Sequence, residues 1–191
     1  RNAPVLPEIR LITGDVLKEY TKYLCDESRA RGTAEAIAFP RSAEEVAAAV
    51  TTAKNNGMTV TVSGARTGIA VGAVPPGGML ISLERMNRVL GIRHQDDAYL
   101  VHCQAGVVLS ELQEALARRY FPDASAWSED DRSVLEGMKR QRLFYPPDPT
   151  ETTATIGGTI ACNASGAHTF RYGPTRQYVH SLKVVLADGS F

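Results

Sequence analysis

The chain has 191 residues with 21 acidic and 21 basic side chains, so its formal net charge is zero. This balance argues against a nucleic-acid-binding protein, which usually carries a basic surplus. The hydrophobic fraction of 43% and the charged fraction of 22% are typical of a soluble globular protein. The length allows one ordinary domain or two small lobes with a real core. No apolar run approaches the roughly 20 residues needed to span a bilayer, and the first residues lack the apolar core of a signal peptide.

Cysteines and histidines give little functional signal. Cys25, Cys103 and Cys162 show no CxxC spacing and cannot all pair within one chain. This favours a reducing compartment or cysteines that simply pack in the interior, as we expect for Cys162. The four histidines show no HExxH or other metal-ligand spacing, so we expect no metal site. The protein is expected to be cytoplasmic.

The first half of the chain predicts alternating helices and strands. A helix is expected from Thr13 to about Ala30, and a strand over residues 36–39. Ser42 and Glu45 form a capping-box pattern in which Glu45 reaches back toward the cap. The helix that follows should end at Asn55-Asn56-Gly57. A strand is then expected over residues 58–62.

The second half continues this alternation. Strands are expected over residues 79–83 and 99–103, and a helix over residues 109–120. Residues 122–142 are expected to form a solvated loop with at most one exposed helix, in which Trp127 is a local packing anchor. The apolar run at residues 179–186 is expected to be a strand. The pattern as a whole predicts a layered α/β or α+β domain.

Two glycine-rich stretches are the most informative feature. Ser63–Ile69 follows the strand at residues 58–62, and Ile156–Gly166 follows the proline-rich stretch 145–149. Glycine allows positive φ and close approach of a backbone to a ligand, and successive N–H groups in such turns can hold an anion. The glycines of either stretch alone could be plain turn residues. Together they predict that both stretches grip one ligand that carries a diphosphate.

Neither stretch fits the common nucleotide-binding motifs. A Rossmann fingerprint requires G-x-G-x-x-G between a strand and a helix. Here Gly64 and Gly68 are spaced G-x-x-x-G, and another Gly/Pro turn follows them. A P-loop would need G-K-S/T, which follows neither stretch. We therefore expect loop backbone, and not a helix N-terminus, to hold the diphosphate.

Several motifs together resemble a known family. They occur in this order: Phe39-Pro40-Arg41-Ser42, Ser63-Gly64-Ala65-Arg66-Thr67-Gly68, Pro146-Pro147-Asp148-Pro149, Ile156-Gly157-Gly158, Asn163-Ala164-Ser165-Gly166, Arg171-Tyr172-Gly173-Pro174-Thr175 and Leu186-Ala187-Asp188-Gly189. The chain resembles the FAD-binding domain of the vanillyl-alcohol oxidase / p-cresol methylhydroxylase flavoprotein superfamily. Within it, the chain looks most like the FAD-linked oxidases that include D-lactate dehydrogenase and the glycolate oxidase flavoprotein subunit. The resemblance covers about residues 10–191, with one poor stretch at residues 121–142.

The resemblance implies a two-lobed α+β fold with FAD between the lobes. The first lobe would be a small parallel sheet with helices, and the second would be mixed or antiparallel and incomplete. Residues 1–191 would be one FAD-binding domain, the N-terminal part of a larger flavoprotein. The implied cofactor-binding residues are Ser63, Gly64, Ala65, Arg66, Thr67, Gly68, Ile69, Pro147, Asp148, Thr152, Thr153, Gly157, Gly158, Cys162, Asn163, Ala164, Ser165 and Gly166.

The resemblance also implies the chemistry. The full protein would oxidise a 2-hydroxy acid such as D-lactate or glycolate, with the substrate held by a domain absent here. The chain would then be either a shortened form or one part of a split flavoprotein, inactive alone and without an assignable catalytic residue. A partner subunit or electron acceptor, and peripheral attachment to the inner membrane in the full-length protein, would fit this branch. FAD is expected to be non-covalent, because the first stretch has no His or Cys; a link from a residue outside these 191 stays open.

Alternatives stay open at this point for the chain as a whole and for two of its residues. The chain could be an FAD-binding module without turnover of its own, or another flavoenzyme such as an aryl-alcohol oxidase or an ether-lipid synthase type. Arg66 could offset phosphate charge or point into solvent. His168 could face the flavin ring, or could have a surface or capping role.

Overall fold

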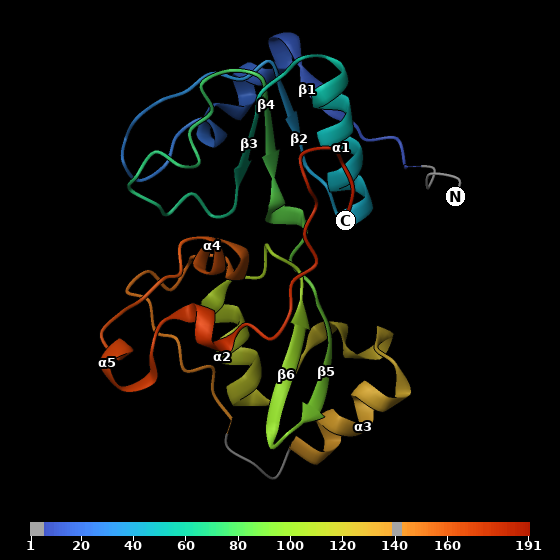
Figure 1. Ribbon diagram of the computed structural model, residues 1–191, viewed down its shortest axis with the longest axis vertical. Coiled ribbons are helices and arrows are strands. Elements are labelled where there is room, and N and C mark those ends of the chain that lie inside the picture. The colour runs from blue at the N-terminus through green and yellow to red at the C-terminus, as the bar shows by residue number, and fades with distance from the viewer. Residues whose placement is uncertain (1–5, 139–142) are drawn as a thin grey trace. The chain divides into compact units, whose positions relative to one another are not determined.

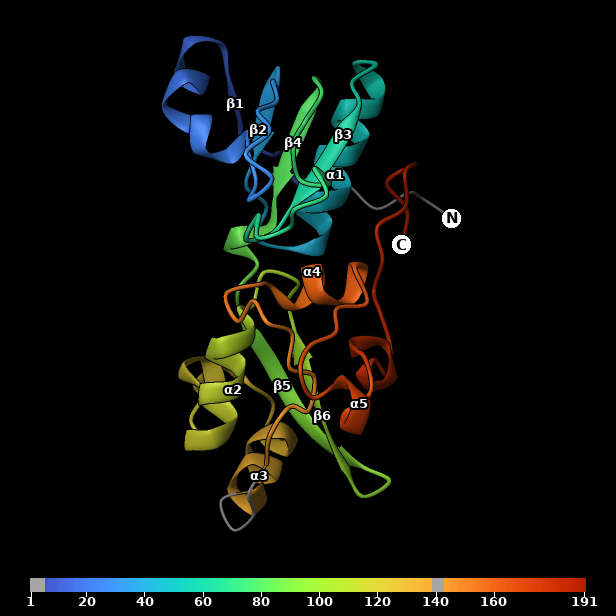
Figure 2. The same cartoon turned by 90° about the vertical axis from the view of Figure 1, so that its left-hand side faces the viewer.

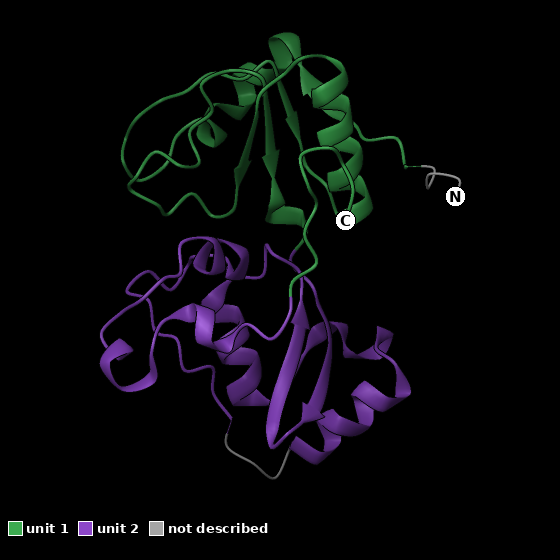
Figure 3. Cartoon of the chain, viewed as in Figure 1, with its two compact units in different colours: residues 1–86, 182–191 green, residues 87–181 purple. Residues whose placement is uncertain are grey.

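The computed structural model describes residues 6–138 and 143–191. The chain divides into two compact units, residues 1–86 with 182–191 and residues 87–181 (Figure 3). Hydrophobic clusters form within each unit. Figure 1 labels the helices and strands. The mixture of helices and sheets agrees with the expected α+β class.

The first unit is built on a four-stranded sheet in the order β1-β2-β4-β3 (Figure 2). Its strands are β1 (Leu11–Thr13), β2 (Ala36–Ala38), β3 (Val60–Ser63) and β4 (Met79–Ser82). Strands β2, β4 and β3 are parallel, as the expected first lobe requires, whereas β1 runs antiparallel to β2 and makes the sheet mixed. Because β3 and β4 are parallel, their carboxyl ends lie at the same edge of the sheet.

Helix α1 (Ala43–Asn55) confirms the prediction of a capped helix. The amide of Glu45 donates to Ser42 Oγ at 3.2 Å. The Glu45 carboxylate accepts from the amide of Arg41 at 2.8 Å, one residue before the expected partner. The chain leaves the helix through Asn56 and Gly57, and Gly57 has a φ of +65°. Local sequence therefore specifies both ends of this helix.

The two faces of the sheet bury alternate residues, as a strand period of two requires. Ala36 and Ala38 of β2 pack with Met79 and Ile81 of β4 against α1. Ile37 and Leu80 pack on the other face with Tyr23. Every side chain of these two central strands is fully buried. The central parallel pair is therefore the core of the first unit.

The helix predicted from Thr13 to about Ala30 is wrong in its second half. Residues Gly14–Tyr23 form a 3₁₀ segment, η1, with a kink at Tyr20. Beyond it, Asp26 Oδ1 accepts hydrogen bonds from the amide and the hydroxyl of Ser28, and Arg29 has a φ of +66°. Such local side-chain bonds to backbone compete with a helix, which explains the early end.

The last residues of the chain belong to the first unit. Lys183 Nζ lies 2.9 Å from the Glu44 carboxylate on α1. A Cβ on Gly189 would lie 2.3 Å from Thr51 Oγ1, also on α1. Residues 179–191 are all described and none is in a strand. The strand expected over residues 179–186 is therefore wrong, and half-exposed Val184 and Leu186 lack sheet partners there.

The second unit contains a β-hairpin. Strands β5 (Val89–Gln95) and β6 (Ala98–Cys103) pair antiparallel, so the antiparallel character expected of the second lobe is confirmed. Asp96 and Asp97 both have positive φ, as a tight hairpin turn requires. Strand β5 was not predicted from the sequence, because Gly91 and the polar Arg93-His94-Gln95 end obscure its alternation. Helix α2 (Leu109–Arg118) confirms its prediction.

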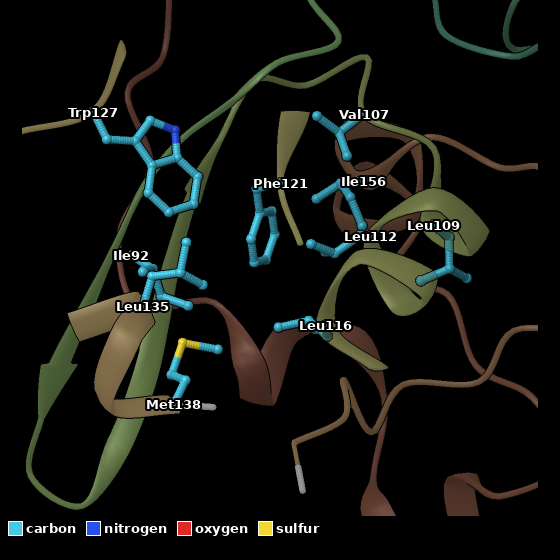
Figure 4. Packing of buried hydrophobic residues seen from close by; sticks show 10 residues of the cluster. All are labelled: Ile92, Val107, Leu109, Leu112, Leu116, Phe121, Trp127, Leu135, Met138 and Ile156. Carbon is cyan, nitrogen blue, oxygen red and sulfur yellow. The ribbon is translucent and has the colours of Figure 1, made fainter. Parts of the chain in front are cut away.

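Short helices complete the second unit: η3 (Pro122–Ala126), α3 (Glu129–Met138), α4 (Ile156–Ala161), α5 (Thr169–Tyr172) and η4 (Thr175–Tyr178). Phe121, Trp127, Leu135 and Met138 are buried with side chains of α2 and β5 (Figure 4). The expected solvated loop over residues 122–142 is therefore wrong where the chain is described, because its apolar residues complete the core. Residues 139–142 lie outside the described residues.

No helix within residues 6–138 and 143–191 is both long and apolar enough to cross a membrane.

Trp127 is the packing anchor that the sequence predicts. Its side chain is 4% exposed, its ring lies 5.1 Å from that of Phe121, and its Nε1 donates to the Val89 carbonyl at 2.9 Å. We expect Trp127→Ala to lower the free energy of unfolding by about 3 to 5 kcal/mol, because it leaves a cavity. Trp127→Phe should cost about 1 to 3 kcal/mol through the unpaired carbonyl.

Chemical denaturation of purified variants measures this difference. Phe170 is fully exposed, so Phe170→Ala is the matched control and should change stability by less than about 0.5 kcal/mol. Equal stabilities for Trp127→Ala and Phe170→Ala would contradict the anchoring role.

Candidate cofactor-binding site

The first glycine loop, Ser63–Ile69, begins at the carboxyl end of β3. Ser63 is the last residue of β3 and is in register with Ser82, the last residue of β4. In sheets with parallel strands, ligands bind outside the carboxyl ends of the strands. The sheet therefore places this loop where such a ligand would bind.

The backbone of the first glycine loop is open to a partner. Among the described residues, the amides of residues 65–70 donate no hydrogen bond to another group of the chain. A Cβ on Gly68 would meet nothing within 4 Å, and Arg66 has a left-handed φ of +61°. Free N–H groups in a turn of this kind can surround an anion. The loop therefore suits a phosphate or diphosphate group.

Two buried hydroxyls lie at the base of this loop. Ser63 is 1% exposed and Ser82 is fully buried, and neither Oγ has a hydrogen-bond partner among the described residues. A buried polar group without a partner costs free energy. An ordered water or the oxygen of a bound group would satisfy these donors, so the chemistry of the site fits a ligand rich in acceptor oxygens.

Arg66 does not point into solvent, which was one of the two alternatives considered from the sequence. Its Nη1 donates back to the Gly64 carbonyl at 3.2 Å, and its Cζ lies 4.6 Å from the centre of the Tyr23 ring. Its own carbonyl accepts from the amide of Glu27 at 3.2 Å. The side chain is therefore packed on the first unit and not extended into solvent.

The tyrosine beneath Arg66 has an unusual environment. Tyr23 Oη donates to the Glu84 carboxylate at 2.8 Å. Burial, followed by the hydrogen bond and the negative charge of Glu84, raises the pKa of Tyr23 to about 12. Tyr23 therefore stays neutral and remains a donor at physiological pH. Sequence analysis did not single out Tyr23, Glu84 or Ser82, because only the fold brings them to the loop.

The second glycine-rich stretch, Ile156–Gly166, is not an open loop. Its first six residues form α4, and the Thr155 hydroxyl caps this helix by accepting from the Gly158 amide at 3.3 Å. The amides of Ile156 and Gly157 donate to the carbonyls of Val107 and Ala105. These N–H groups are already bound within the second unit, so this stretch offers fewer free donors than the sequence suggested.

Two glycines of the second stretch are required by close packing within the second unit. A Cβ on Gly157 would lie 2.9 Å from the Ala105 carbonyl oxygen, and one on Gly166 would lie 1.5 Å from that of Asp148. Close packing of backbone on backbone therefore requires glycine at both positions. Gly158 is less confined, because the only contact of its Cβ would be with Thr155 Oγ1 at 3.1 Å.

The remaining predicted residues of the second unit differ in exposure. Cys162 is exposed, which corrects the expectation that it packs in the interior. Asn163 has a φ of +45° and accepts from the Arg176 amide at 3.0 Å. Ala164 and Ser165 follow it, and the Ala164 carbonyl accepts from buried Thr175. These bonds hold the turn after α4 in place.

Asp148 lies beside His168. Their side chains form an ion pair when His168 is protonated, and His168 precedes α5 without capping it through its side chain. Thr153 donates to the Glu151 carboxylate at 2.5 Å, while Thr152 is exposed and Pro147 is buried. No group of three or more potential metal ligands occurs in the parts of the chain that the structure describes.

The structure therefore places Ser63 to Ile69 in the first unit and the other predicted residues in the second. The idea that both groups contact one ligand stays a prediction.

Comparison with known proteins identifies the family of this chain. The FAD binding domain family matches residues 34–138 and 127–191. The chain is 39% identical over 183 residues to D-lactate dehydrogenase of Anaerostipes hadrus, covering 94% of this chain and 33% of that protein. It is 38% identical over 156 residues to D-2-hydroxyglutarate dehydrogenase of Xanthomonas citri pv. viticola, covering 81% and 28%. The chain thus spans about a third of the length of these relatives.

Solved structures share the fold. Carbohydrate oxidase from Microdochium nivale matches with a TM-score of 0.69 at 20% identity, covering 95% of this chain and 34% of that one. Glucooligosaccharide oxidase from Acremonium strictum matches with a TM-score of 0.66 at 22% identity, covering 95% and 33%. The chain belongs to the FAD binding domain family and is the FAD-binding domain of a flavoprotein.

Proposed function

We propose that this chain holds FAD non-covalently through the first glycine loop and supplies the flavin of an oxidoreductase that acts on a 2-hydroxy acid. The observation that carries the first part is the run of free amides at residues 65–70. The second part is supported by the relatives, which are named for D-lactate and D-2-hydroxyglutarate. All of these compounds carry a hydroxyl beside a carboxylate.

The loop suits the diphosphate of FAD better than its ring. Peptide N–H groups in turns bind phosphate oxygens well. The amides of residues 65–70 lie after the end of β3, so they can bind a phosphate without breaking a hydrogen bond of the sheet. Asp148, Thr152, Thr153 and the exposed part of the second stretch would contact other parts of the cofactor. When bound, the flavin supplies the hydride and electron chemistry, while the protein supplies position and electrostatics.

The attachment is proposed to be non-covalent. The glucooligosaccharide oxidase noted above carries a 6-S-cysteinyl, 8α-N1-histidyl FAD. The first glycine loop of this chain contains neither Cys nor His. Denaturing the flavin-loaded protein in acid should therefore release all of the flavin into the supernatant.

A charge placed at Gly68 tests the loop as the diphosphate site. Because its Cβ would enter open space, we expect Gly68→Asp to fold normally. Its carboxylate should weaken FAD binding by at least about tenfold through repulsion from the phosphates. Gly68→Asn has nearly the same shape without the charge and is the matched control, with a change below about threefold. Fluorescence titration with FAD measures both, and equal affinities for the two variants would place the diphosphate elsewhere.

The groups that bind the 2-hydroxy acid are proposed to lie in the rest of the flavoprotein, because this chain matches only about a third of its relatives. We therefore expect the FAD-loaded chain to keep its yellow colour when D-lactate is added without oxygen. Dithionite should bleach the same sample, which shows that the flavin can be reduced. Bleaching by D-lactate itself would mean that these 191 residues hold the substrate-oxidising groups.

A further inference from the structure

Three side chains from distant parts of the first unit meet at the first glycine loop. We propose that Tyr23, Arg66 and Glu84 form a brace that holds this loop in its FAD-binding shape, and that Arg66 is a positioning residue and not a phosphate ligand. This inference rests on the proposed FAD-binding role of the loop. The brace is defined here as these three side chains together with the Glu27 amide.

The Arg66 side chain contacts both its own loop and another part of the first unit. Its guanidinium donates to the Gly64 carbonyl two residues earlier at 3.2 Å. The same guanidinium lies over the Tyr23 ring, with Cζ 4.6 Å from its centre. A cation stacked on an aromatic face is attracted to it, most strongly where water is excluded. The Arg66 side chain therefore holds the middle of the loop against the Tyr23 ring.

Tyr23 makes a rigid platform. It is 6% exposed, and the ring of Phe39 packs edge-on against it at 5.0 Å. Its hydroxyl donates to Glu84 Oε1 at 2.8 Å. Glu84 belongs to η2 (Leu83–Arg85), which directly follows β4. The ring and the hydroxyl of Tyr23 are therefore both held by residues that closely follow central strands of the sheet.

A backbone bond reinforces the same connection. The Glu27 amide donates to the Arg66 carbonyl at 3.2 Å. Residues 23–27 therefore hold Arg66 by both its side chain and its main chain. Because Arg66 has a left-handed φ of +61°, which an L side chain adopts at some cost, outside contacts are needed to keep it there.

The division of labour follows from this geometry. The guanidinium already uses one donor on its own loop and one face on Tyr23, and the Glu84 carboxylate adds a negative charge beside the same ring. The amides of residues 65–70 donate no hydrogen bond to any of the described residues. In the proposed division, the amides bind the diphosphate, and Arg66 fixes their direction through its contacts with Gly64 and Tyr23.

A double-mutant cycle tests the brace. We compare Tyr23→Leu, Arg66→Met and the double variant by FAD titration at several salt concentrations. If Arg66 acts through Tyr23, each single variant should weaken FAD binding by about tenfold. The double variant should then bind FAD no more weakly than the single variant with the lower affinity. The salt dependence should be unchanged in all of them. Tyr23→Phe keeps the ring and should lose less than about threefold, a rescue that fits stacking.

A direct phosphate contact gives the opposite pattern. Arg66→Met would then weaken binding and flatten its salt dependence, because an ion pair with the diphosphate would be lost. Tyr23→Leu would have little effect, and the two effects would multiply. That result overturns the proposal. Arg85 lies over Phe39 at 5.1 Å in the same aromatic cluster, so Arg85→Met is the matched control and should leave FAD affinity within about twofold.

Trypsin cleavage tests the brace without FAD. Trypsin cuts after arginine, so a side chain packed on Tyr23 should protect the bond after Arg66. We expect Tyr23→Leu to speed cleavage at Arg66 by at least about tenfold and Tyr23→Phe by less than about threefold, while Arg85→Met matches the wild type. Equal cleavage rates in all four proteins would overturn the brace. If the wild type fails to bind FAD, the proposed function fails, and the cleavage rates still decide this inference.

Discussion

The parallel pairing of β3 with β4 is the constraint on which the rest of the first unit depends. It puts Ser63 and Ser82 at one edge of the sheet and starts the first glycine loop there. The side chains of β4 are fully buried between α1 on one face and the aromatic cluster around Tyr23 on the other. The burial that stabilises this sheet therefore also fixes the base of the candidate site. The loop above that base keeps free backbone donors, because no strand or helix in residues 6–138 and 143–191 uses them.

The two stretches are both rich in glycine but have different roles in the fold. In the second unit, glycine lets α4 pack closely on Ala105, and the turn after it pack on Asp148. Most of its amides are bound by neighbouring carbonyls. In the first unit, Gly68 faces open space and the nearby amides are free among the described residues. The structure therefore favours the first glycine loop as the place where backbone meets diphosphate, and it assigns the second stretch a larger structural share.

Sequence reasoning succeeded where structure is set locally. The cap at Ser42, the stop at Gly57 and the apolar run of β4 each depend on a few neighbouring residues. It failed where distant partners decide. No sequence pattern near Val89 indicates that Trp127 donates to the Val89 carbonyl and helps to bury β5. The packing of Arg66 on Tyr23 joins residues 43 positions apart, so no local pattern indicates it. The glycine loops were found because their composition is local, whereas their free and bound amides depend on the whole fold.

The central claim is that amides of the first glycine loop bind the diphosphate of FAD. Backbone amide NMR of the 191-residue chain tests it directly, with FAD, ADP and riboflavin added in turn. ADP carries the diphosphate without the flavin, and riboflavin carries the flavin ring without any phosphate. The account predicts that FAD and ADP both shift the amide signals of residues 65–70 and that riboflavin leaves them in place. Unshifted loop signals in saturating FAD, or equal shifts with riboflavin, would contradict it.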